Sequence, residues 1–120
     1  AVFRTFALSL ALCATVPFSA QAFERISDRA MFVNTVDGRD LRIALYALTL
    51  NVRADGTIVG RAAGWGITGL WVWEDGYFCR DMDWSGTEID YNCQLVEVSG
   101  NRIRFTTDQG AGNDAVLRIR

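Results

Sequence analysis

The sequence predicts an all-β domain, an antiparallel meander of about eight short strands with one short N-terminal helix and one disulfide. Two observations lead to this prediction. After Asp40, short apolar runs alternate with turn dipeptides such as Asp-Gly and Gly-Asn, and no helical period returns. Cys79 and Cys93 lie in two neighbouring runs. We expect the meander to form a curled sheet or a small barrel, because closure removes exposed strand edges.

The first 22 residues are typical of a secretory signal peptide. Arg4 precedes an apolar run from Phe6 to Val16, and the small-residue motif Ala20-Gln21-Ala22 follows. This run is shorter than the roughly 20 residues that a membrane-spanning helix requires. We therefore expect cleavage between Ala22 and Phe23, which leaves one domain, 23–120, in the periplasm or outside the cell. The alternative is a buried N-terminal helix of the domain.

The predicted helix of the domain covers Asp28 to about Val36. Ser27 is a suitable N-cap, and Gly38 follows the last turn. Apolar residues such as Phe32 supply the face that we expect to be buried. Leu41–Tyr46 predicts the first long strand.

Three hairpins are predicted from turn dipeptides. In the first, the run Leu48–Val52 leads to Asp55-Gly56, a signal for a two-residue type I′ turn, and Ile58-Val59 begin the return strand. The second joins Leu70–Glu74 to Tyr77–Asp81 through Asp75-Gly76.

The register of the second hairpin places Trp73 opposite Phe78, Val72 opposite Cys79, and Trp71 opposite Arg80 as a cation–π neighbour.

The third hairpin joins Cys93–Ser99 to Arg102–Thr107 through Gly100-Asn101, which pairs Val98 with Ile103, Val96 with Phe105 and Glu97 with Arg104. A Gly-rich turn beginning at Gln109 then leads into a last strand, Ala115–Arg120, in which Leu117 and Ile119 alternate with arginines.

Cys79 and Cys93 are the two cysteines of the predicted mature domain. An even number of cysteines in a small exported domain favours a disulfide. Closing a loop of about 15 residues stabilises a domain by roughly 3 kcal/mol. The alternative is a pair of unpaired buried thiols.

The composition excludes several classes of enzyme. The sequence has no histidine and no lysine, and all 12 basic residues are arginines. Ser-His-Asp and Cys-His hydrolysis, histidine-based zinc sites and Schiff-base chemistry therefore lack their essential residues. Residues 23–120 hold eleven arginines against fourteen acidic residues, a net charge of −3. This balance gives no basic stripe for nucleic acid.

The segment Asp81–Gly86 matches the start of a calcium-binding loop. Asp81, Asp83 and Ser85 supply oxygens at the first, third and fifth positions, glycine occupies the sixth, and Thr87 offers a carbonyl at the seventh. The twelfth position is Asn92 instead of the usual glutamate. The alternative is a solvated acidic loop between two strands.

Aromatic residues are dense in the second half of the chain, and most of them are expected in the core. Trp84 and Tyr91 lie close in sequence to Asp83, Glu88 and Asp90, and we predict an exposed binding patch formed by these five residues. An acidic and aromatic surface suits a cationic partner.

The run Gly69–Asp81, followed by Asn92-Cys93-Gln94, resembles a largely uncharacterised family of small exported alphaproteobacterial proteins. The resemblance covers most of the predicted mature domain, and some members carry the name dihydrodipicolinate reductase. That name implies a cytoplasmic NAD(P)H-dependent enzyme with a glycine-rich dinucleotide turn and with His and Lys in its site. This sequence has neither residue type and no such turn between a strand and a helix.

These observations predict a non-catalytic module of the cell envelope that binds a protein or a small apolar ligand. One version is an inhibitor, like the small disulfide-bearing barrels that block lysozyme, a comparison that rests on fold class alone. The alternative is the NAD(P)H-dependent reductase of the family name. We expect no nucleic-acid partner, no membrane span after cleavage, and no cofactor other than the calcium considered above.

Overall fold

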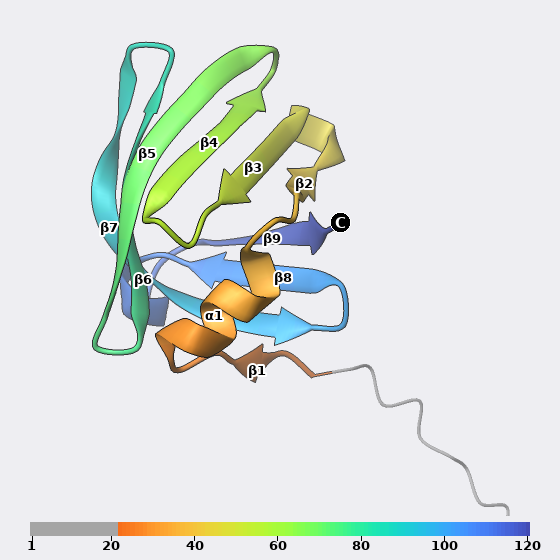
Figure 1. Cartoon of the computed structure of the whole chain (residues 1–120), viewed down its shortest axis with the longest axis vertical. Coiled ribbons are helices and arrows are strands. Elements are labelled where there is room, and N and C mark those ends of the chain that lie inside the picture. Colours follow the sequence, from red (N-terminus) through yellow and green to blue (C-terminus); the bar gives the residue numbers. More distant parts are fainter. Residues whose placement is uncertain (1–21) are drawn as a thin grey trace, which may run out of the picture.

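The computed structural model describes residues 22–120 (Figure 1). The predicted signal peptide lies outside these residues, apart from Ala22. Within the part of the chain that is described, no helix has the length and apolar character needed to cross a membrane.

The described residues form nine strands, one α-helix and two short 3-10 helices. The strands are β1 Glu24–Arg25, β2 Leu41–Ile43, β3 Leu48–Val52, β4 Thr57–Ala62, β5 Trp65–Glu74, β6 Tyr77–Trp84, β7 Thr87–Ser99, β8 Arg102–Thr106 and β9 Asp114–Ile119. The helices are α1 Arg29–Val36, η1 Ala44–Tyr46 and η2 Asp108–Gly110.

Strands β2 to β9 form a closed antiparallel barrel. Each strand from β2 to β7 is hydrogen-bonded to the next, β9 pairs with β2, and β8 lies between β9 and β7. The 13-residue strand β7 pairs with β6 along its first part, and β1 covers the same edge near its end, at Glu97 and Val98. The predicted all-β meander and small barrel are confirmed.

The second and third predicted hairpins have the expected registers. Trp73 lies opposite Phe78 and Trp71 opposite Arg80. Asp75 and Gly76 both have positive φ, 53° and 83°, as a type I′ turn requires. In the third hairpin all three predicted pairs form, and an ion pair of 3.0 Å joins Arg104 to Glu97.

Three local predictions were wrong. The N-cap is Asp28, whose carboxylate accepts a hydrogen bond of 2.8 Å from Met31 N, so the helix starts one residue later than the Ser27 cap implied. The strand at Leu41 ends at Ile43 because Ile43 pairs directly with Leu48, and residues 44–47 form the connection between β2 and β3.

The third correction concerns the first hairpin. Its loop has three residues, 54–56, since Arg53 and Thr57 still hydrogen-bond across the strands and only Gly56 has positive φ. The Asp55 carboxylate accepts hydrogen bonds from the Thr57 amide and hydroxyl, which holds this wider loop.

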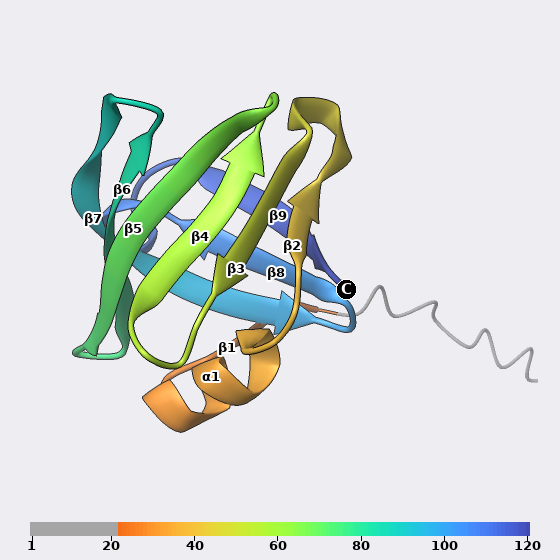
Figure 2. The same ribbon diagram turned by 45° about the horizontal axis from the view of Figure 1, so that its top comes forward.

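Helix α1 covers one end of the barrel (Figure 2). Phe32 is completely buried, and its ring lies 5.0 Å from the Trp73 ring and 5.0 Å from the Phe78 ring. Asp37, just beyond the helix, accepts a hydrogen bond of 3.0 Å from Ala54 N in the β3–β4 loop. The aromatic core therefore fills the end of the barrel beneath α1.

Candidate functional site

A partly open cavity of about 310 Å³ lies inside the barrel beyond the aromatic core. We call it the inner cavity. Its walls are mostly apolar and come from β2, β3, β4, β6, β7, β8 and β9, with Leu48, Leu50, Met82, Phe105 and Leu117 among the lining side chains. Its volume lies at the lower end of the range of small-molecule sites in proteins, about 300–1,000 Å³.

An apolar groove continues from the inner cavity at the end of the barrel opposite α1. Leu48, Leu50 and Met82 line both spaces. We call this space the mouth groove, and its other lining residues include Leu45, Tyr46, Ala62, Ile67, Trp84 and Ile89. Leu45 in η1 is 84% exposed. Hydrophobic side chains thus extend from the barrel interior to the solvent.

Two polar side chains are buried in the described residues, Arg80 and Gln94, and both line the inner cavity. They are 8% and 7% exposed. In β6 the side chains alternate, so Arg80 faces inward with Phe78 and Met82. Gln94 is the β7 partner of Phe78 and therefore neighbours Arg80 diagonally.

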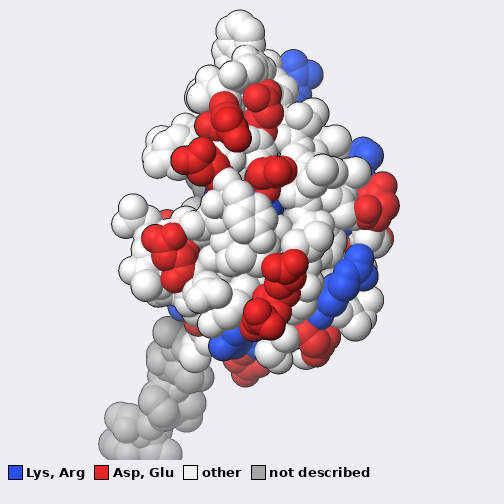
Figure 3. All heavy atoms as spheres, turned by 90° about the vertical axis from the view of Figure 1, so that its left-hand side faces the viewer, with Lys and Arg blue, Asp and Glu red and all other residues white. Residues whose placement is uncertain are grey.

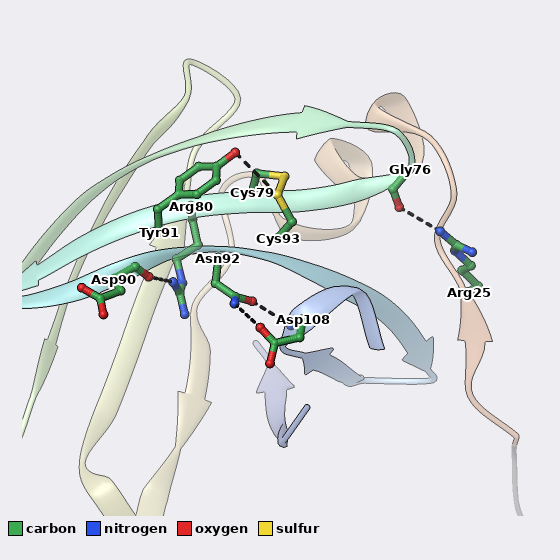
Figure 4. Close-up of a disulfide and its surroundings, with 9 residues drawn as sticks. All are labelled: Arg25, Gly76, Cys79, Arg80, Asp90, Tyr91, Asn92, Cys93 and Asp108. Atoms are coloured by element: carbon green, nitrogen blue, oxygen red, sulfur yellow. Dashed lines mark hydrogen bonds between the residues drawn. A yellow bond between two sulfur atoms is a disulfide. The ribbon is translucent and has the colours of Figure 1, made fainter. Parts of the chain in front are cut away.

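A bulge in β7 fixes the position of the Arg80 side chain. The β6–β7 register shifts between Arg80 and Met82, and the Asp90 carbonyl oxygen at this irregularity accepts a hydrogen bond of 2.7 Å from Arg80 Nη1 (Figure 4). Burial lowers the pKa of the Arg80 guanidinium from its ordinary value, and the charge of Asp81 opposes this shift. Arginine nevertheless stays protonated at neutral pH.

The connection between β8 and β9 forms one wall of the inner cavity. Thr107 and Asn113 line the cavity from this connection, and Asp114 lines it from the start of β9. Asn92 holds it against β7, because its amide donates to the Asp108 carboxylate at 2.7 Å and accepts from Asp108 N at 3.0 Å. Figure 4 shows this pair of hydrogen bonds beside Arg80.

The predicted disulfide between Cys79 and Cys93 is confirmed. The two cysteines are directly opposite in β6 and β7, on the outer face, and Figure 4 shows the disulfide and the Arg80 side chain on opposite sides of the sheet. The Tyr91 hydroxyl lies 3.5 Å from Cys93 Sγ.

The predicted binding patch is divided between two faces. Asp83 and Glu88 are opposite each other in β6 and β7, and the exposed Asp90 and Tyr91 follow along β7. Trp84 lies on the inward face of β6 and lines the mouth groove. Its Nε1 donates a hydrogen bond of 3.1 Å to the Ala62 carbonyl. The structure therefore groups Tyr91 with the acidic residues and places Trp84 at the cavity opening.

The segment predicted as a calcium loop is a strand and a tight turn. Asp81 and Asp83 lie within β6, while Ser85 and Gly86 form the turn with φ values of 49° and 95°. The Asp83 carboxylate accepts a hydrogen bond of 2.8 Å from Gly86 N, and Thr87 begins β7.

Among residues 22–120, no three acidic, cysteine or histidine side chains gather as metal ligands do. Calcium binding at this hairpin stays a prediction, and unfolding temperatures with calcium and with a chelator would test it.

Sequence reasoning missed Arg80 as a candidate site residue. It treated Arg80 as a cation–π partner of Trp71, whereas the guanidinium over the Trp71 ring belongs to Arg29, 5.2 Å from its centroid. The sequence does indicate this position for Arg80. In a strand, alternate residues lie on the same face, and Arg80 alternates with the apolar Phe78 and Met82.

Comparison of the chain with protein-family models, with curated proteins and with solved structures finds no match in any of the three. The resemblance to exported alphaproteobacterial proteins therefore stays a prediction.

Proposed function

We propose that this chain is a non-catalytic, exported binding module that holds a small apolar ligand inside its barrel. The observation that carries the proposal is the continuous apolar surface from the inner cavity through the mouth groove to solvent, opposite the end that α1 covers. Apolar, largely pre-formed cavities with a few polar groups are the usual sites for small molecules. The disulfide supports export, because such bonds persist mainly in oxidising compartments.

Binding of the neutral fluorescent probe N-phenyl-1-naphthylamine tests the proposal. We expect saturable binding with increased fluorescence, because apolar surroundings replace water around the probe. Leu48→Trp should weaken binding at least about tenfold, since the larger side chain fills the space shared by the cavity and the groove.

The matched control is Leu70→Trp, which adds the same side chain at an outer position that is 62% exposed. This variant should bind the probe like the wild type. Absence of saturable binding, or equal loss in both variants, would contradict the proposal.

A second candidate function, binding of a cationic protein, is favoured by the outer face of β5–β7. Leu70 and Tyr91 are 62% and 58% exposed there, and Figure 3 shows acidic side chains gathered over the upper part of this face. Lysozyme is a suitable basic probe for this surface. We expect salt-sensitive binding that Tyr91→Arg weakens and Arg118→Gln, on a different face, leaves unchanged.

The reductase implied by the family name makes a different prediction, because it requires NADPH binding. The inner cavity is small and apolar, and it holds no glycine-rich turn at a helix N-terminus for a pyrophosphate. We expect no NADPH binding by calorimetry, and binding at micromolar concentrations would overturn the proposed function.

A further inference from the structure

We propose that Arg80 and Gln94 recognise the carboxylate of an amphipathic ligand whose hydrocarbon part occupies the inner cavity. This inference rests on the proposed function, and it adds the chemical class of the ligand. It is argued from the charge and hydrogen bonding of Arg80, the position of Gln94, and the shape of the apolar space beside them.

Arg80 is a buried cation that forms no ion pair within the described residues. The two ion pairs of residues 22–120 join Arg42 to Asp40 and Arg104 to Glu97. The hydrogen bond that Arg80 makes goes to a neutral backbone carbonyl and uses Nη1, whereas a guanidinium has five N–H donors. A desolvated charge is costly unless it is paired. A ligand carboxylate would supply the missing negative charge inside the cavity.

Asp81, Asp108 and Asp114 lie near the cavity, but none of them forms an ion pair with Arg80. Asp81 lies on the outer face of β6, and its carboxylate accepts a long hydrogen bond of 3.3 Å from Leu70 N. Asp108 is held by Asn92. Asp114 lines the cavity from an exposed position and forms no ion pair with Arg80.

Gln94 places a second polar group on the wall of the same cavity. Its side chain is buried and lines the inner cavity, and none of the side-chain hydrogen bonds within residues 22–120 uses its amide. A carboxylate has two oxygens that accept several hydrogen bonds, and arginine donates to both in a fixed geometry. The Gln94 amide offers a further N–H donor on the same wall.

The remaining surface suits a hydrocarbon chain. A volume of about 310 Å³ corresponds to about ten to fifteen non-hydrogen atoms, because a water molecule occupies about 30 Å³ in the liquid and packed carbon atoms occupy less. From Arg80, the inner face of β6 continues through Met82 to Trp84 at the mouth groove. An alkyl chain can follow this path, so we expect a medium-chain monocarboxylate.

Competition between decanoate and decan-1-ol for the bound naphthylamine probe tests the inference. Both compounds have the same hydrocarbon chain, and only decanoate carries a charge at neutral pH. We expect the wild type to bind decanoate about ten- to a hundredfold more tightly than decan-1-ol, the range for hydrogen bonds to a charged group. Decylammonium should compete more weakly than decan-1-ol, because it places a second cation beside Arg80.

Arg80→Met should remove the preference for decanoate and keep the binding of decan-1-ol. Arg118→Met, which removes an exposed arginine on β9, is the matched control and should keep the preference. Gln94→Leu should reduce the preference several-fold, and it gives an independent variant if Arg80→Met does not fold.

The outcomes separate the two proposals. If decan-1-ol binds and decanoate binds no better, or if Arg80→Met keeps the wild-type preference, the carboxylate site is wrong and the apolar cavity stands. If neither compound nor the probe binds, both proposals are overturned.

Discussion

Two adjacent residues of β6 place different chemical groups on the two faces of the strand. Cys79 points outward to the disulfide, and Arg80, the next residue, points inward to the cavity. The alternation of a strand therefore places a covalent cross-link and a buried cation one residue apart. The cross-link joins β6 to β7 beside the bulge that positions Arg80.

The disulfide should be a major source of stability. It closes a loop between residues that are 14 apart in sequence, and the loop-entropy relation gives about 3 kcal/mol for such a loop. Cys79→Ala/Cys93→Ala should therefore lower the free energy of unfolding in urea by about that amount. Adding reductant should destabilise the wild type and leave the double variant unchanged, whereas equal stability of the two proteins would contradict this expectation.

Two glycines of β5 differ in how closely the neighbouring strand approaches them. Gly69 in β5 has no side chain, and a Cβ built there would overlap the Asp81 carbonyl oxygen of β6. Gly66 belongs to the same strand, but a Cβ there meets no atom within 4 Å. The two glycines thus differ in packing within one element.

Gly69→Ala should destabilise the barrel by about 2–3 kcal/mol, because β5 and β6 would have to separate. Gly66→Ala is the control and should change stability by less than about 0.5 kcal/mol. Urea unfolding of both variants measures the difference. Equal stabilities would show that β5 and β6 adjust to the added methyl group.

The outer surface of β2, β9 and β8 carries like charges directly opposite one another. Arg118 in β9 is paired with Arg42 of β2 and with Arg102 of β8. Opposed like charges destabilise a sheet. Arg118→Glu should therefore raise the free energy of unfolding by about 0.5–1 kcal/mol at low salt.

Salt distinguishes this charge effect from a change in packing. The gain from Arg118→Glu should shrink at high ionic strength, and Arg118→Gln should give a smaller gain. A loss of stability in the glutamate variant, or a gain independent of salt, would contradict the charge explanation.

The sequence predicted the elements whose structure is set locally. Type I′ turn chemistry at Asp75-Gly76 and the alternation of Trp71 and Trp73 determine the register of β5 with β6. The same logic predicted the pairing of Val96 with Phe105. The loop at Asp55 was wrong because hydrogen bonds of its side chain to Thr57 favour three loop residues.

The candidate site could not be predicted in the same way. The inner cavity depends on the pairing of β9 with β2, which joins strands far apart in the sequence and closes the barrel. A charged residue such as Arg80 is expected on the surface, and the Asp90 carbonyl that accepts its hydrogen bond comes from a bulge that the sequence does not signal. Trp84 and Asp83 could have been assigned to different faces from the sequence, because adjacent residues of a strand point to opposite sides.

At the scale of the whole molecule, the barrel has one filled end and one open end. Helix α1 inserts Phe32 among aromatic side chains at the filled end, and the mouth groove lies at the other. This asymmetry leaves the inner cavity continuous with the mouth groove, with which it shares Leu48, Leu50 and Met82.

The stability of the barrel should depend on this helix. Phe32→Ala should cost about 3–5 kcal/mol, because it leaves a cavity among the packed rings. Met31→Ala, on the exposed side of α1 at 49% exposure, should cost less than about 1 kcal/mol. Thermal unfolding measures both, and similar melting temperatures for the two variants would show that α1 does not support the core.

The central claim, that the interior of the barrel is a ligand site, is tested most directly by ¹H–¹⁵N NMR during titration with decanoate. We predict that amide shifts change along β3, β6 and the β8–β9 connection, where residues such as Leu50, Met82 and Asn113 line the inner cavity. Changes confined to the outer positions Leu70, Val72 and Tyr91, or a spectrum that does not change at saturating ligand, would contradict the claim.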